Sequence, residues 1–206
     1  ARVRTATATE RTPPVCRASR RLVPPSIDGK IDDWDWGRSE AVVKLLWTHE
    51  GVASGNLMGR ALLSYDANAL CLALDVVLPT GQTFDLSNSV EWSFASADLK
   101  ATTPIYVLSG RGDGSFESLT AMGADGKQAA RLKAGTHYAA GRSATGWACE
   151  WRVAWEALGV SPDALPTAWL MNVGVHAVGN PSWLVWVPTG GRVCEVENAG
   201  ILRLGQ

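Results

Sequence analysis

Apolar residues alternate with polar ones along several short runs of this chain, and this period of two restricts the fold more than any other feature. The clearest run is Trp147–Trp155, in which every second residue counted from Trp147 is apolar. Leu70–Val77 and Ser89–Ala95 repeat the pattern. Successive side chains of a strand point to opposite sides of a sheet, so each run predicts a strand with one buried face. The indoles at Trp147, Trp151 and Trp155 are therefore expected to form a row that faces the core.

Turn-forming residues separate these runs from other strand candidates, since the chain contains 21 Gly and 10 Pro. The further candidates are Val15–Leu22, Ala41–Leu46, Gly59–Ser64, Ile105–Ser109, Tyr138–Gly141, Trp169–His176, Ser182–Val187 and Gly200–Leu204. One helical turn is predicted after Trp155, stopped by Gly159 and Pro162. Residues 120–135 show little pattern. The sequence thus predicts an all-β fold, an antiparallel β-sandwich with one short helical turn.

The length of 206 residues fits one medium-sized domain. Residues 1–24 are interpreted as a leader or linker ending in a first edge strand, and residues 25–206 as the domain. A formal net charge of −1 provides no field for nucleic acid phosphates or an anionic membrane surface. No apolar run approaches the length of a membrane span. We therefore expect neither a nucleic acid nor a membrane as partner.

No pattern of catalytic residues stands out. Glu91 and Glu150 lie on predicted strands, but the sequence sets no distance between them, and Arg152 suggests a surface ion pair with Glu150. The histidines are not accompanied by a Gly-x-Ser-x-Gly nucleophile motif. Three acids near the N-terminus are expected to be turn and cap residues, namely Asp28, Asp32 and Asp33. The sequence favours a protein that is not an enzyme.

The four cysteines lack the spacing of a zinc site. Cys71 and Cys149 lie in apolar runs, so they are expected to be buried thiols. Cys16 and Cys194 lie near the two chain ends, in segments able to lie side by side. For this pair both a disulfide and two free thiols remain open.

Tryptophan is unusually abundant, with ten residues against three Phe and three Tyr. An indole can fill a core or stack on a ligand. Trp183 and Trp186 are three residues apart on one predicted strand, so they point to opposite faces. We expect one of them in the core and the other exposed near the loop that begins at Pro188, where its flat ring can stack on a sugar.

Six segments in this order resemble the signature of the family 9 carbohydrate-binding modules and their DOMON-like relatives. They are Ile27–Trp36, the strand pair Ala61–Asp66 and Leu70–Leu74, Ser89–Phe94, Trp147–Pro162, Trp169–Asn172 and Gly200–Leu204. The resemblance covers most of residues 25–204. It implies an immunoglobulin-like or DOMON-like β-sandwich that binds sugar without cleaving it.

The resemblance also implies which residues contact the sugar. The Glu of the Ser-Val-Glu strand is Glu91, an acceptor for hydroxyl groups. The two clamping tryptophans of the family fall at Asp85 and near Val193, so Phe84 is the nearest aromatic residue to the first of them. The carbohydrate-binding set expected here is Trp186, Trp183, Glu91, Phe84 and Asn172. Calcium ions often support loops of the family, and Asp85 with Asn88 is the ligand pair expected here.

The chain is thus expected to be a secreted module, extracellular or periplasmic, of a polysaccharide-degrading enzyme such as a glycoside hydrolase. Its expected partners are a glucan- or xylan-type saccharide and a neighbouring catalytic domain. One alternative is a structural module that packs on a catalytic domain through its tryptophans. Another is a haem-binding electron-transfer domain, for which the Met and His candidates are Met58, Met122, Met171 and His176. Met171 and His176 are five residues apart on one strand and therefore face opposite sides.

Overall fold

The computed structural model describes residues 12–55, 57–97, 104–121, 125–144, 146–180 and 183–205. Strands dominate it. They are β1 (Val15–Arg20), β2 (Val42–Leu45), β3 (Trp47–Thr48), β4 (Met58–Tyr65), β5 (Ala69–Val77), β6 (Ser89–Ser96), β7 (Ile105–Arg111), β8 (Phe116–Ala121), β9 (Thr136–Arg142), β10 (Gly146–Ala154), β11 (Ala168–His176), β12 (Leu184–Val185) and β13 (Gly200–Leu204). The predicted β-rich fold is confirmed.

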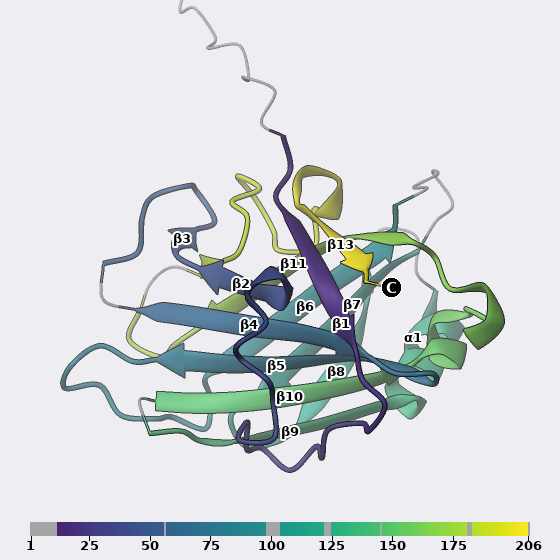
Figure 1. Cartoon of the computed structure of the whole chain (residues 1–206). Coiled ribbons are helices and arrows are strands. Elements are labelled where there is room, and N and C mark those ends of the chain that lie inside the picture. Colours follow the sequence, from purple (N-terminus) through teal and green to yellow (C-terminus); the bar gives the residue numbers. More distant parts are fainter. Residues whose placement is uncertain are drawn as a thin grey trace, which may run out of the picture.

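Most strands lie on one hydrogen-bonded path in the order β8-β7-β6-β11-β13-β1-β4-β5-β10-β9. We call β8, β7, β6, β11 and β13 together the β6 half of the sheet, and β4, β5, β10 and β9 the β5 half. In Figure 1 the β5 half lies in front of β6, β7 and β8. The strand pairs within each half are antiparallel.

Strand β1 joins the two halves, and it runs parallel to both of its neighbours. Its residues Val15–Ala18 pair with Ile201–Leu204 of β13, and its last two residues, Ser19 and Arg20, pair with β4. The sequence predicted an edge strand here, and each part of β1 pairs with one neighbour only: the first four residues with β13 and the last two with β4. The prediction of a purely antiparallel sheet is wrong, because β1 runs parallel to both of these strands.

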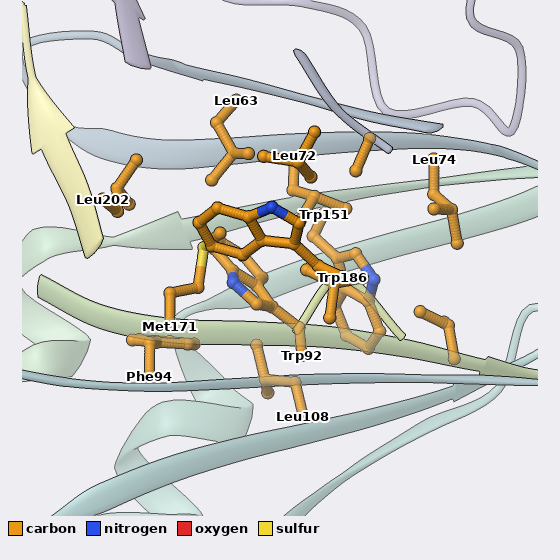
Figure 2. Packing of buried hydrophobic residues seen from close by; sticks show 14 of the residues in the cluster. Leu63, Leu72, Leu74, Trp92, Phe94, Leu108, Trp151, Met171, Trp186 and Leu202 are labelled. Atoms are coloured by element: carbon orange, nitrogen blue, oxygen red, sulfur yellow. The ribbon is translucent and has the colours of Figure 1, made fainter. Parts of the chain in front are cut away.

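The main core lies between the two halves, as Figure 2 shows for part of it. The β6 half contributes Trp92, Phe94 and Met171, and the β5 half contributes Leu72 and Trp151. The predicted inward faces are confirmed, because the alternate apolar residues of Leu70–Val76, Val90–Phe94 and Trp147–Trp155 are all in this core. At the two ends of the path, the rings of Phe116 on β8 and Tyr138 on β9 have centroids 6.0 Å apart. The sheet is therefore nearly closed.

Five indoles are almost completely buried in this core, those of Trp92, Trp147, Trp151, Trp155 and Trp169. The N–H of Trp155 donates to the carbonyl oxygen of Asp66 at 3.1 Å. The other four indole N–H groups have no hydrogen-bond partner among the described residues. Most of the tryptophan surplus therefore fills the core, where area burial outweighs the loss of these hydrogen bonds.

A loop between β1 and β2 covers the outer face of the β5 half, and Glu150 on β10 holds it there. The buried carboxylate of Glu150 accepts hydrogen bonds from the backbone N–H groups of Asp28 (3.0 Å) and Gly29 (2.7 Å) and from Nε1 of Trp34 (2.7 Å). Burial raises the pKa of Glu150, and the three hydrogen bonds oppose this shift. The predicted surface ion pair with Arg152 is wrong, because Arg152 pairs with Asp66.

Two of the acids in this loop have the predicted turn role. Asp28 Oδ1 accepts from the N–H of Lys30 at 3.0 Å, and Asp33 Oδ2 accepts from the N–H of Ser26 at 2.9 Å. Both carboxylates thus fix the backbone of the loop rather than face a ligand.

The short helical turn predicted after Trp155 is confirmed as η2 (Trp155–Leu158), which ends at Gly159 with φ +70°. The α-helix α1 (Gly126–Ala134) was missed, because Leu132 is its only buried residue and leaves no apolar period to detect. A capping box between Asp125 and Gln128 starts this helix. The remaining helical segments are η1 (Ser39–Ala41), η3 (Pro162–Ala164) and η4 (Val196–Asn198).

Within the described part of the chain, no helix has the length and apolar character needed to cross a membrane.

All four cysteines are buried free thiols. Cys16 lies in the main core, whereas Cys194 packs with Val107 and Val196 on the outer face of the β6 half. The two residues are therefore on opposite sides of the sheet, and no disulfide joins them. The expected burial of Cys71 and Cys149 is confirmed.

Candidate functional site

The outer face of the β6 half carries a carboxylate near its centre. Because Val90, Trp92 and Phe94 point into the core, Glu91 on the same strand points outward. Glu91 pairs with Gly174 on β11 and with Ser109 on β7. Since Gly174 has no side chain, other residues can lie close to the carboxylate on that side.

Trp183 lies over this glycine. A Cβ atom built at Gly174 would be 3.1 Å from Cε3 of Trp183 and 2.7 Å from Cγ2 of Val193. The indole of Trp183 is half-buried, and its centroid is 5.7 Å from that of the His176 ring, the neighbouring outward side chain on β11. The tryptophan thus presents part of its ring to solvent beside Glu91.

Two adjoining depressions share Glu91 and Trp183, and we call them together the Glu91 site. The first, of about 390 Å³, is lined by His49, Glu91, Val107, Leu119, Trp183, Gly191, Arg192, Val193 and Cys194. The second, of about 420 Å³, is lined by Leu86, Ser87, Ser89, Glu91, Ser109, Arg111, Asp113 and Trp183. Both volumes are in the range of small-molecule sites.

The polar groups of the site provide both acceptors and donors. Oε1 of Glu91 accepts a hydrogen bond from the Ser93 hydroxyl at 3.1 Å. Burial raises the pKa of Glu91, while this hydrogen bond and the charge of Arg192 oppose the shift. Arg192 lines one depression and Arg111 the other. A carboxylate next to a partly exposed indole, with an arginine in each depression, suits a neutral polyhydroxylated ligand.

Trp186 does not belong to this site. Its side chain is 9% exposed and lies in the main core, where Figure 2 shows it among Leu63, Trp92 and Met171. The expectation that Trp183 and Trp186 point to opposite faces is confirmed, and the exposed member is Trp183. Trp186 lines neither depression of the Glu91 site, and the main core encloses most of its ring, so the structure gives no support for a stacking role at that site.

Asn172 and Phe84, the other two expected sugar contacts, lie outside the Glu91 site and make contacts within the fold. The buried amide of Asn172 accepts from the N–H of Val187 at 3.1 Å and donates to its carbonyl oxygen at 2.9 Å. It therefore fixes the segment that follows β12. The ring of Phe84 packs 6.4 Å from that of Trp147 and lies under the Arg142 guanidinium. Phe84 lines neither depression of the Glu91 site.

The nominated calcium ligands do not offer a convergent set of oxygen atoms. Oδ1 of Asp85 accepts from the N–H of Ser87 at 2.7 Å within an exposed turn. Oδ1 of the buried Asn88 accepts from the N–H of Val178 at 2.9 Å. Both oxygens hold backbone N–H groups, so this pair does not fit a calcium ion. In the part of the chain that the structure describes, no three His, Cys, Asp or Glu side chains cluster as metal ligands.

The structure separates the residues considered for other chemistry. Glu91 and Glu150 lie on the outer faces of opposite halves, so they do not form a pair across one site. Met171 is in the core and His176 is on the outer face, as the spacing predicted. Met58 is exposed on β4, and Met122 lies outside the described residues.

Several site residues were not found from the sequence. Ser109 and Arg111 are outward residues of β7, since they alternate with the buried Leu108. The period of two along this strand could have predicted their outward position. His49 and Arg192 come from loops far apart in the chain, and no local pattern connects them with Glu91. Only the folded structure brings these loops together.

The fold has counterparts among solved structures, although no family model and no curated protein matches the sequence. A family 9 carbohydrate-binding module of Caldicellulosiruptor kristjanssonii, solved with cellotriose, has a TM-score of 0.62 at 16% identity, covering 92% of this chain and 93% of that chain. The same kind of module from this organism, solved with glucose, has a TM-score of 0.61 at 17% identity, covering 93% of this chain and 95% of that chain. A protein of Bacteroides uniformis, described as a candidate carbohydrate-binding protein, has a TM-score of 0.63 at 12% identity, covering 94% of this chain and 100% of that chain.

These similarities extend over nearly the whole of each chain. The protein therefore has the fold of the family 9 carbohydrate-binding modules. The resemblance seen in the sequence is confirmed at the level of the fold.

Proposed function

We propose that this chain is a carbohydrate-binding module of family 9 type, which binds a glucan- or xylan-type saccharide at the Glu91 site. One observation carries the proposal: the carboxylate of Glu91 and the half-exposed indole of Trp183 border the same two depressions. The fold supports it, because neighbours of this fold were solved with cellotriose and glucose.

The roles of the residues follow from their chemistry. The Trp183 ring stacks on the apolar C–H face of a sugar ring. The carboxylate of Glu91 accepts hydrogen bonds from hydroxyl groups, and Arg192 and Arg111 donate to ring or hydroxyl oxygens. Val193 and His176 border Trp183, which limits the movement of its ring.

The proposed function is binding without cleavage. Glycoside hydrolysis needs two carboxyl groups on either side of the bond that breaks. The second carboxylate of the Glu91 site, Asp113, accepts from both the N–H and the hydroxyl of Ser115, at 2.8 and 2.6 Å, and so closes its own turn. We infer that Asp113 serves the loop and not a reaction.

Within this proposal, the chain is a secreted module, extracellular or periplasmic, attached to a polysaccharide-degrading enzyme such as a glycoside hydrolase. The alternative of a module that docks through a tryptophan patch has less support, because seven of the ten indoles are buried. The haem alternative has less support because Met171 and His176 face opposite sides of β11.

The test is a titration of the purified protein with glucose, cellotriose and xylotriose, followed by calorimetry and tryptophan fluorescence. We expect saturable binding, and about a tenfold loss of affinity in Glu91→Gln and in Trp183→Ala. Glu117→Gln is the matched control, since this exposed carboxylate lies on the same face but lines neither depression. A flat titration with correctly folded protein would reject the proposed function.

A further inference from the structure

A groove lies on the other side of the hairpin that begins with β3. Trp47 and Gly51 of this hairpin line the groove, whereas His49 between them lines the Glu91 site. The hairpin is fixed in place, because β3 pairs with β12 and the N–H of Gly190 donates to the carbonyl oxygen of His49 at 2.9 Å. The groove and the Glu91 site are therefore lined by alternate residues of the same hairpin.

Trp47 is exceptional among the tryptophans of the chain. Of the ten, all of which are described, it alone is exposed, with 42% of its surface accessible. Its indole N–H forms no hydrogen bond with any described residue. A chain that buries most of its indoles in the core thus leaves one open at the edge of a groove, where its flat ring is free to stack on a ligand.

The groove has the volume and the chemistry of a saccharide site. Its volume is about 810 Å³, which lies within the range of ligand pockets. Pro188 adds apolar surface next to the indole, and the exposed residues Lys44, Glu197 and Asn198 provide donors and acceptors for hydroxyl groups. The indole of Trp186 lines the groove as well, and charges of both signs with an amide beside two aromatic rings match a neutral sugar.

We propose that this groove is a second carbohydrate subsite, in which Trp47 stacks on sugar units of a chain whose other units occupy the Glu91 site. The inference rests on the proposed function, because it assigns the further units of the same ligand. A proline-rich peptide also stacks on exposed indoles. The position of the groove beside the Glu91 site, across a single hairpin, favours the saccharide.

The experiment compares short and long ligands by calorimetry, using glucose, cellotriose and cellohexaose with the whole chain. Wild-type protein is expected to bind cellohexaose at least fivefold more tightly than glucose, with one ligand per chain. Trp47→Ala is expected to remove this gain and to leave glucose affinity unchanged. Val52→Ala is the matched control, because Val52 is an exposed apolar residue of the same hairpin that lines neither hollow. Circular dichroism and thermal unfolding confirm that each variant is folded.

The results distinguish this inference from the proposed function. If cellohexaose and glucose bind equally well, or if Trp47→Ala leaves cellohexaose affinity unchanged, the second subsite is refuted while sugar binding at Glu91 stands. A Trp47→Ala protein that loses glucose affinity equally would show that Trp47 acts only by supporting the Glu91 site. Binding of a proline-rich peptide in the groove without any dependence on glucan length would also refute the subsite. Absence of binding to all three sugars and to xylotriose overturns both proposals.

Discussion

Gly174 lies directly opposite Glu91 in the β6–β11 pair, and its missing side chain leaves space beside the carboxylate. Trp183 and Val193 occupy part of that space, since both would lie within 3.1 Å of a Cβ atom at this position. A single glycine therefore makes it possible for an indole to lie next to an outward-facing carboxylate. The Glu91 site depends on this arrangement as much as on the residues that contact a ligand.

The substitution Gly174→Ala tests this dependence. The added methyl group must displace Val193 or Trp183, so we expect sugar affinity to fall about fivefold and the free energy of unfolding to fall by about 1–3 kcal/mol. Calorimetry and urea unfolding measure the two effects. Gly126→Ala serves as control, because a Cβ atom there meets no other atom within 4 Å. Unchanged affinity in Gly174→Ala would show that binding does not depend on the close packing of Val193 and Trp183 over this glycine.

Sugar binding is expected to weaken in acid because of Glu91. Burial raises the pKa of this carboxyl group above its ordinary value. The ionised form is the better acceptor, so affinity is complete above the raised pKa and is lost as the pH falls through it, starting at a higher pH than for an exposed Glu. Binding isotherms between about pH 4 and 8 measure the profile.

The control for this profile is a pair of variants. Glu91→Gln has no carboxyl group to titrate and is expected to bind weakly at every pH. His49→Gln removes the histidine of the first depression, and we expect it to keep the wild-type midpoint. A midpoint that moves with His49→Gln would assign the pH dependence to the imidazole instead.

Glu150 is expected to be important for stability but not for binding. Removing its carboxylate in Glu150→Ala leaves the N–H groups of Asp28, Gly29 and Trp34 without their acceptor. We expect the free energy of unfolding to fall by about 3 kcal/mol or more, with glucose affinity unchanged in the folded protein. Urea unfolding compares Glu150→Ala with Glu117→Ala, which removes an exposed Glu and is expected to change the free energy of unfolding little. A loss below about 1 kcal/mol would mean that water replaces the carboxylate.

The thiols provide a test that needs no mutation. Burial raises the pKa of Cys16 and of Cys71 to about 12, and raises that of Cys149 as well, so these thiols stay protonated and unreactive at pH 8. Cys194 borders the Glu91 site and is 8% exposed, so it is expected to react first with a thiol reagent. Bound cellotriose should slow this reaction. Four thiols are expected to react after unfolding; fewer would indicate a disulfide.

The alternating runs were sufficient to predict the core. Leu70–Val77, Ser89–Ala95 and Trp147–Trp155 have the predicted inward faces, because a strand between core and outer surface must alternate. The same rule placed Glu91 outward. It gave the wrong environment for Glu150, since the loop that covers the outer face of β10 packs there through contacts distant in the sequence.

The composition of the candidate site was harder to predict than its centre. Trp183 and Glu91 were both predicted and line the site, whereas Trp186, Asn172 and Phe84 lie outside its two depressions. Their residue types fitted a sugar contact, and only the folded structure shows where their side chains lie. Arg192 and His49 reach the site on loops whose positions depend on the complete fold.

The parallel pairing of β1 with β13 determines how the domain would resist a pulling force applied to its two ends. Tension on the segment before β1 and on the segment after β13 acts in opposite directions along two adjacent parallel strands. The hydrogen bonds that join Val15–Ala18 to Ile201–Leu204 would then be loaded together in shear, instead of opening one after another. Because β1 also pairs with β4, slippage of this strand would separate the two halves at once.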